Sequence, residues 1–237
     1  GEYGTPNIDI EEGWLEVRHN DRNHTFLYPR QASSLYHTTK IMDTDLLWFY
    51  TRTWGIRVTD LMQGPVYGLF TDENRKYFDL LPHFNYDEVF GTVINRFIVQ
   101  AVIGHPLTVY GRGGQTRGYL NIQDSLNSIE LALETPPSKG ELRIFNQFVE
   151  TFSVNQIAKK IKQAAKKLSL PVSIKSITNP RNELEDHYYN PKHIGLLELG
   201  LKPHYLEDEV LIEMIDWVST HKKQIVESRI LQGVKWN

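Results

Sequence analysis

The sequence predicts an α/β fold. Short runs rich in β-branched and aromatic residues alternate with amphipathic helical segments along the chain, and this alternation is typical of βα units. Hydrophobic residues make up 40% and charged residues 23% of the 237 residues, which is an ordinary globular balance. The length suffices for one large domain or for parts of two.

The first half of the chain is expected to begin with a loop and a β-hairpin. Between the two runs of the hairpin lie the turn formers Asn20–Asn23. A helix follows, with Ser33 near its start and Gly55 just past its end. The expected loop, hairpin, helix, strand, second loop and irregular aromatic stretch cover residues 1–13, 14–28, 33–54, 56–61, 63–68 and 71–90.

The second half alternates strands and helices more regularly. Ser153 is the expected N-cap of a lysine-rich amphipathic helix, and Asp124 is expected at or near the N-cap of an earlier one. Gly111–Gly114 reads as a turn. The expected helices cover residues 92–102, 124–133, 153–168, 192–199 and 208–226, and the expected strands cover 107–110, 119–122, 142–146 and 173–177.

The number of early strands limits the domain organisation. A complete doubly wound nucleotide-binding domain needs more βα units than residues 1–70 supply, and the glycine-rich strand-turn-helix fingerprint is absent from the sequence. We therefore expect the end of a Rossmann-type NAD-binding domain in residues 1–90. A smaller α/β substrate-binding domain follows mainly in residues 91–237, from which some elements return to the Rossmann sheet.

Composition excludes several classes of protein. The net charge of −3 shows no basic bias for nucleic acid, and Lys159–Lys167 reads as the solvated face of one helix. Without cysteine, the chain has no disulfide scaffold, thiolate metal site or thiol nucleophile. The nine histidines show no zinc-type spacing, so we expect no metal. No apolar run reaches about 18 residues, so we expect no membrane span.

Tyr36 and Lys40 are the first candidate site. They are four residues apart on an expected helix and so share one face. An ammonium close to a phenol favours the phenolate, so such a pair can act as a base near neutral pH. His37 is adjacent, and an imidazole suits proton shuttling. The ordinary alternative is a helix surface with one aromatic residue and one solvated lysine.

A second candidate site is the segment Leu107–Tyr119, with Gln115 and Arg117 beside its glycine turn. A guanidinium gives bidentate, charge-assisted hydrogen bonds to phosphate oxygens, so this segment suits a diphosphate. Arg181, after Pro180, is a further candidate. The alternative for either arginine is a solvated surface residue.

The order of these features resembles the second half of an extended short-chain dehydrogenase/reductase. That resemblance implies that Tyr36 is the catalytic base, and that Lys40 activates it and anchors the nicotinamide ribose. It also implies that Gln63, Gly64, Pro65 and Val66 line the nicotinamide side of a bound NAD. Gln115, Arg117 and Arg181 would contact the nucleotide diphosphate.

Within this group, segments along nearly the whole chain are similar to the UDP-sulfoquinovose synthases. Each motif is short, and their shared order makes the resemblance specific. They are Gly1–Gly13, Tyr28–His37, Trp54–Asp60, Asp87–Thr92, Gly104–Tyr110, Phe145–Phe148, His187–Asn190 and Glu198–Tyr205.

The resemblance implies a reaction of UDP-glucose with sulfite that gives UDP-sulfoquinovose. NAD would be recycled through transient oxidation at C4, water would leave across C5–C6, and sulfite would add. Tyr36 would move the 4-hydroxyl proton, and His37 is a candidate acid/base for the C5–C6 steps. Another NAD-dependent nucleotide-sugar 4-epimerase or 4,6-dehydratase is the alternative enzyme, and a non-catalytic UDP-sugar-binding fragment is the alternative outside enzymes.

The family's phosphate-cradling glycine turn, its acidic residue for the adenosine ribose and its catalytic Ser/Thr do not occur in these 237 residues. The chain starts without Met, and we expect these groups upstream of Gly1. We therefore expect residues 1–237 alone to bind NAD poorly, and the upstream segment to restore binding.

The resemblance also implies an assembly and a compartment. Related enzymes often dimerise through two helices, and the apolar run Leu46–Tyr50 suits a homodimer contact, although it suits burial within one monomer equally well. The location would be cytoplasmic in a prokaryote or the plastid stroma in a plant.

Overall fold

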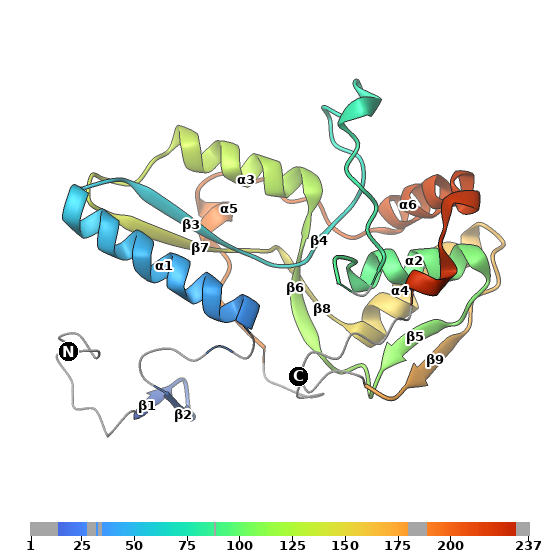
Figure 1. Ribbon diagram of the computed structural model, residues 1–237, viewed down its shortest axis with the longest axis horizontal. Coiled ribbons are helices and arrows are strands. Elements are labelled where there is room, and N and C mark those ends of the chain that lie inside the picture. Colours follow the sequence, from blue (N-terminus) through green and yellow to red (C-terminus); the bar gives the residue numbers. More distant parts are fainter. Residues whose placement is uncertain (1–13, 28–31, 33–34, 88, 180–188, 231–237) are drawn as a thin grey trace. The chain divides into compact units, whose positions relative to one another are not determined.

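The structure is a computed structural model that describes residues 14–27, 32, 35–87, 89–179 and 189–230 (Figure 1). The chain divides into two compact units. Unit 1 comprises Gly1–Asp60 with Pro137–Arg143, and unit 2 comprises Leu61–Pro136 with Ile144–Asn237. The expected division into a nucleotide domain over 1–90 and a substrate domain over 91–237 stays a prediction.

Unit 1 contains the expected hairpin, formed by β1 (Trp14–His19) and β2 (Arg22–Leu27). The strands pair antiparallel, with His19 opposite Arg22. The two turn residues, Asn20 and Asp21, have φ of +49° and +57°. A two-residue hairpin turn of this hand suits Asn and Asp, which tolerate the left-handed conformation.

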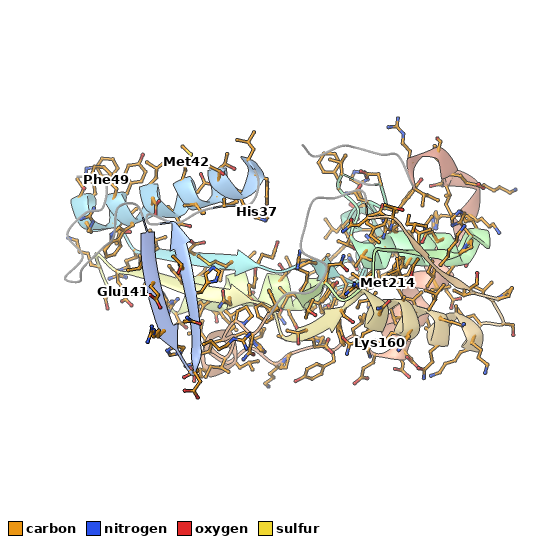
Figure 2. All side chains as sticks on the ribbon, turned by 90° about the horizontal axis from the view of Figure 1, so that it is seen from below. His37, Met42, Phe49, Glu141, Lys160 and Met214 are labelled. Atoms are coloured by element: carbon orange, nitrogen blue, oxygen red, sulfur yellow. The ribbon has the colours of Figure 1, made fainter. Side chains whose placement is uncertain are left out.

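The long helix α1 (Leu35–Trp54) follows in the same unit, as expected. It ends where Gly55 takes φ +64° and donates its N–H to the carbonyl of Thr51 at 3.0 Å. Thr44 and Thr51 are its buried residues, and the Thr44 hydroxyl donates to Asp60 at 2.8 Å. Met42 and Phe49 lie on its outer side (Figure 2). The buried residues of α1 are therefore polar, and several of its exposed residues are large and apolar.

In β3 (Val58–Gln63), the Val58 N–H donates to the Glu141 carbonyl, next to β7 (Leu142–Gln147). Strand β3 begins and ends two residues later than the strand predicted at residues 56–61.

Unit 2 has its hydrophobic core between three helices and a parallel strand pair. The helices are α2 (Val93–Ile103), α4 (Val154–Lys167) and α6 (Asp208–Thr220), and they pack against one another (Figure 1). Strand β5 (Leu107–Tyr110) pairs in parallel with β9 (Ile174–Ile177). Burying each large apolar side chain contributes about 1.5–3 kcal/mol. The buried residues of this core include Ile94, Phe97, Ile98, Leu107, Ile157, Ile161, Leu211 and Met214, the last of which is labelled in Figure 2.

The caps of these helices follow from the sequence. Thr92 caps α2 by accepting the N–H of Asn95, and Gly104 ends it at φ +80°. Ser153 caps α4 in a reciprocal capping box with Gln156, which confirms the expected N-cap. These caps place the helix starts within one residue of expectation.

A three-stranded sheet of order β4-β6-β8 lies beside this core. Strand β4 (Val66–Tyr67) runs parallel to β6 (Thr116–Asn121), which pairs antiparallel with β8 (Glu150–Ser153). Sequence reasoning treated residues 66–67 as loop and missed β8. These strands are too short to show an alternating pattern, so pairing with β6 defines them.

Helix α3 (Ile122–Glu134) begins two residues before the expected start. Asp124 was expected at or near the N-cap; the cap itself is Asn121, which accepts the N–H of Gln123. Asp124 lies instead in the first turn and is buried.

The C-terminal helices are shorter than expected. Only one turn, α5 (Gly195–Glu198), forms within 192–199, since His193 is held by the Pro191 carbonyl and by stacking on Phe148. After α6 the chain continues in 3₁₀ turns η2 (Lys222–Gln224) and η3 (Glu227–Arg229), and a further turn, η1 (Phe78–Leu80), lies in the irregular stretch. Within the described ranges, no helix is long and apolar enough to cross a membrane.

Candidate functional site

Tyr36 and Lys40 lie together on the exposed side of α1. Tyr36 is 65% exposed, and the Lys40 Nζ lies 5.9 Å from the centre of its ring. The four-residue spacing on a helix produces this contact. His37 meets the Tyr36 ring edge to face, with 5.4 Å between ring centres. The helix thus presents a phenol, an ammonium and an imidazole to a ligand.

The Lys40 ammonium also pairs with Asp43, at 2.9 Å between Nζ and Oδ2. The hydrogen bond and the charge of Asp43 raise the pKa of Lys40 above its ordinary value. Both side chains are more than half exposed, so this ion pair contributes little to stability. Its consequence is that Lys40 remains protonated and keeps a fixed positive charge beside the phenol.

The segment Gln63–Val66 belongs to a second candidate site, which lies in unit 2. The Gly64 N–H donates to the Gln147 carbonyl at 3.0 Å, and the Pro65 carbonyl accepts the N–H of Leu120 at 3.2 Å. Val66 pairs with Leu120 in the parallel ladder. The segment that was expected to flank a nicotinamide is therefore anchored on both sides by backbone hydrogen bonds.

Gly64 and Gly118 allow the Gln63–Val66 segment to pack closely on β6, and β6 to pack closely on Phe148. A Cβ on Gly64 would lie 2.4 Å from the Gly118 carbonyl oxygen, and a Cβ on Gly118 would lie 2.3 Å from the Phe148 ring. Both distances are below any normal contact, so only glycine fits at either position.

Gln115 and Arg117 flank the start of β6, next to the same segment. Gln115 is 3% exposed, and its Nε2 donates to the Tyr110 carbonyl at 3.4 Å. Its Oε1 is buried and accepts no hydrogen bond from the part of the chain that the structure describes. Such an acceptor costs about 1–3 kcal/mol unless a ligand satisfies it. Arg117 is partly exposed and donates from Nη1 to the Thr116 carbonyl at 3.0 Å.

Tyr119 continues β6 into the core and packs against Phe152. Burial raises its pKa to about 12, and the positive charge of Arg117 opposes this shift. Tyr119 is therefore a neutral phenol at physiological pH.

The structure brings the predicted site residues together in two groups. Tyr36, His37 and Lys40 share α1 in unit 1, while Gln63–Val66, Gln115 and Arg117 gather around β6 in unit 2. Arg181 lies outside the described residues.

Sequence reasoning missed the buried polar residues that support β6. The Gln63 Nε2 donates to Ser125 Oγ at 2.8 Å and to Gln147 Oε1 at 3.1 Å. Ser125 and Gln147 are both buried. The polar pair inside Phe145–Phe148 was the only signal for Gln147, and nothing in the pattern linked it to Gln63 across 84 residues.

A second buried network holds the segment before α6. The Asp124 carboxylate accepts the His204 N–H at 2.8 Å and contacts its Nδ1, and burial raises the pKa of Asp124. Glu150 accepts the Leu206 N–H at 2.7 Å and the Tyr67 hydroxyl at 3.1 Å. Burial, with the charge of Glu150 next, raises the pKa of Tyr67. Both carboxylates help to anchor this segment.

Among the described side chains, no group of three or more His, Asp or Glu could hold a metal ion.

The mixture of helices and parallel strand pairs defines an α/β protein. A profile of the NAD dependent epimerase/dehydratase family matches residues 16–146. The match covers more than half of the chain, and the chain belongs to this family.

Two curated relatives match along the full chain. A chloroplastic UDP-sulfoquinovose synthase from Spinacia oleracea is 51% identical over 236 residues, which is 100% of this chain and 49% of the relative. A UDP-sulfoquinovose synthase from Sulfolobus acidocaldarius is 45% identical over 239 residues, which is 100% of this chain and 61% of the relative. The chain therefore spans about half to three fifths of the length of these relatives.

Solved structures of the family share the fold. An epimerase from Methanothermobacter thermautotrophicus superposes with a TM-score of 0.63 at 16% identity, covering 85% of this chain and 56% of that one. The UDP-glucose 4-epimerase of Thermus thermophilus in complex with NAD gives 0.59 at 22% identity, covering 84% and 57%. At these identities the likeness concerns the fold alone.

Each unit by itself offers groups that suit part of a dinucleotide. The exposed phenol and ammonium of α1 suit the hydroxyls of a ribose. The unsatisfied acceptor of Gln115 and the partly exposed guanidinium of Arg117 suit the polar groups of a nucleotide.

Proposed function

We propose that the protein is an NAD-dependent enzyme that forms UDP-sulfoquinovose from UDP-glucose and sulfite. The observation that carries this proposal is the identity of 51% and 45%, along the whole chain, to two relatives named for this activity. The motifs around Tyr36, Gly64 and Arg117 support it, because each is chemically suited to one part of the reaction.

NAD, when bound, supplies a reversible hydride acceptor for C4 of the glucose, so the overall reaction involves no net redox change. Tyr36 takes the proton of the 4-hydroxyl and later returns it. Lys40 supports this role by placing a positive charge 5.9 Å from the centre of the Tyr36 ring. The raised pKa of Lys40 beside Asp43 keeps that charge in place.

The C5–C6 steps require a second acid/base. A carbonyl at C4 acidifies the C5 proton, water leaves from C6, and sulfite adds to the resulting alkene. His37 lies against the Tyr36 ring and is the residue we assign to these proton transfers.

The diphosphate of the substrate is assigned to β6. Arg117 supplies a charged fork that suits phosphate oxygens, and the Gln115 amide lies beside it. Arg181 is assigned to the same diphosphate from the sequence. Gln63–Val66 is assigned to the nicotinamide side of the cofactor.

A homodimer is part of the same proposal. The apolar face of α1 supports it, with Trp48 and Phe49 about half exposed. Phe49→Glu should shift the protein from dimer to monomer in sedimentation equilibrium, since a charge would be buried in the contact. Phe90→Glu, at an exposed position in unit 2, is the matched control. If Phe49→Glu dimerises as tightly as Phe90→Glu does, α1 does not form the dimer contact.

The function is tested by the product formed by the complete gene product that carries these 237 residues. UDP-glucose, NAD and sulfite are supplied, and the products are identified by mass spectrometry. A sulfonated UDP-hexose that needs all three components is the expected result. If UDP-galactose or a 4-keto-6-deoxy sugar forms equally well with and without sulfite, the protein is instead a 4-epimerase or a 4,6-dehydratase. UDP binding without any product would support a binding role instead.

A further inference from the structure

Three polar side chains from separate elements interlock beside the Gln63–Val66 segment. Gln63 ends β3, Ser125 lies in the first turn of α3, and Gln147 ends β7. Gln63 donates from Nε2 to Ser125 Oγ at 2.8 Å and to Gln147 Oε1 at 3.1 Å. Gln147, which is 1% exposed, donates from Nε2 to the Ser125 backbone carbonyl at 3.4 Å.

This network determines which way the Gln63 amide points. A backbone carbonyl can only accept, so Gln147 must turn its NH₂ toward Ser125 and its oxygen toward Gln63. That oxygen can also only accept, so Gln63 must turn its NH₂ inward. The chain of bonds therefore begins at the Ser125 carbonyl and leaves the Gln63 oxygen as the outward group.

The outward oxygen is available to a ligand. Gln63 is an exposed residue, and its Oε1 accepts no hydrogen bond from any residue that the structure describes. An acceptor held in a fixed direction favours a ligand that offers an N–H or O–H group. It disfavours a carboxylate, because two acceptors would face each other.

We propose that Gln147 is a positioning residue that locks the Gln63 amide, so that the site accepts the NH₂ of the nicotinamide carboxamide and discriminates against a carboxylate at that place. This inference rests on the proposed function, which assigns the nicotinamide side of NAD to Gln63–Val66. Gln147 itself touches no ligand in this proposal and acts only through Gln63.

The test compares the binding of two dinucleotides by titration calorimetry, without substrate. One is NAD, and the other is nicotinic acid adenine dinucleotide, in which a carboxylate replaces the carboxamide. The complete gene product should bind NAD at least about tenfold more tightly, as expected for the loss of one directed hydrogen bond and its replacement by repulsion.

Two substitutions should remove this preference. Gln147→Met keeps the side-chain volume but removes the amide that orients Gln63. The Gln63 amide can then turn its NH₂ outward, and the preference for NAD over nicotinic acid adenine dinucleotide should fall below about threefold. In Gln63→Met, at an exposed position, the acceptor itself is lost and the ratio should fall similarly.

Two controls should keep the wild-type ratio. Ser125→Ala removes the hydroxyl but keeps the backbone carbonyl that orients Gln147. Gln163→Met makes the same chemical change on the exposed face of α4.

Equal binding of both dinucleotides by the wild-type protein would overturn the inference and leave the proposed function standing. An undiminished preference in Gln147→Met, or in Gln63→Met should the buried variant fail to fold, would overturn it as well. A wild-type protein that binds neither dinucleotide would overturn the proposed function and this inference together.

Discussion

Helix α1 and strand β6 carry the two candidate sites, and they are built in different ways. On α1 the side chains of Tyr36, His37 and Lys40 are exposed and contact mainly one another and Asp43. Around β6, glycine contacts and buried amides fix each group in place. This difference matches the division of labour in the proposed function, in which α1 supplies reactive groups and β6 supplies a rigid binding surface.

The largest expected effect is on the α1 side of this comparison. Tyr36→Phe keeps the ring but removes the base, and turnover in the product assay should fall by about 10²- to 10⁴-fold. Tyr77→Phe is the matched control, since Tyr77 is similarly exposed, at 62%. Turnover by Tyr36→Phe within a few fold of the control would remove Tyr36 from the chemistry.

On the β6 side, Arg117→Gln should weaken the binding of UDP by about 10- to 100-fold, because a charged hydrogen-bonding pair is lost. Calorimetric titration with UDP measures the effect. The neighbouring Arg112→Gln, in the glycine turn, provides a control of equal charge change. Equal losses in the two variants would indicate a general effect of charge rather than a phosphate contact at Arg117.

Gly64→Ala tests whether the rigidity of the β6 region matters. The added methyl would meet the Gly118 carbonyl oxygen at 2.4 Å, so the free energy of unfolding should fall by about 1–3 kcal/mol and UDP binding should weaken. Urea unfolding and UDP titration measure the two effects. Gly104→Ala, where nothing lies within 4 Å, should leave UDP binding unchanged. A Gly64→Ala protein with wild-type stability and affinity would show that the strands can separate without consequence.

The smallest effect concerns Tyr119 at alkaline pH. Its pKa is raised to about 12 in the folded protein, chiefly by burial, so the folded state holds this proton more tightly than the unfolded state. Its contribution to the free energy of unfolding is complete below the pKa of the unfolded state, near 10, and is lost as the pH rises from 10 to 12.

Tyr119→Phe should therefore flatten the fall in unfolding free energy between pH 10 and pH 12, by at most about 2–3 kcal/mol. Denaturant unfolding at several pH values measures this slope. Identical slopes in the wild-type protein and in Tyr119→Phe would exclude a buried, neutral Tyr119.

Much of the fold follows from local sequence signals. Ser153, Thr92 and Gly55 stand at helix boundaries because their caps or left-handed backbone conformations require those residue types. Strand β5 matches its expected bounds because an apolar run lies between two turn signals. Such signals act within a few residues and are therefore readable in a single sequence.

The errors arose where distant pairing decides the structure. Strands β4 and β8 exist because β6 lies beside them, and α3 begins two residues before its expected start, with Asn121 as its cap. By contrast, the contact between Tyr36 and Lys40 follows from their spacing of four residues on a helix. The bonds from Gln63 to Ser125 and Gln147 span 62 and 84 residues and left no local pattern.

The division of labour between α1 and β6 is tested most directly by titrating UDP into the Tyr36→Phe gene product whose turnover has been measured. The account predicts an affinity for UDP within about twofold of wild type, beside a turnover reduced by at least about 100-fold. A loss of UDP affinity as large as the loss of turnover would contradict it, since Tyr36 would then contribute to binding rather than to chemistry.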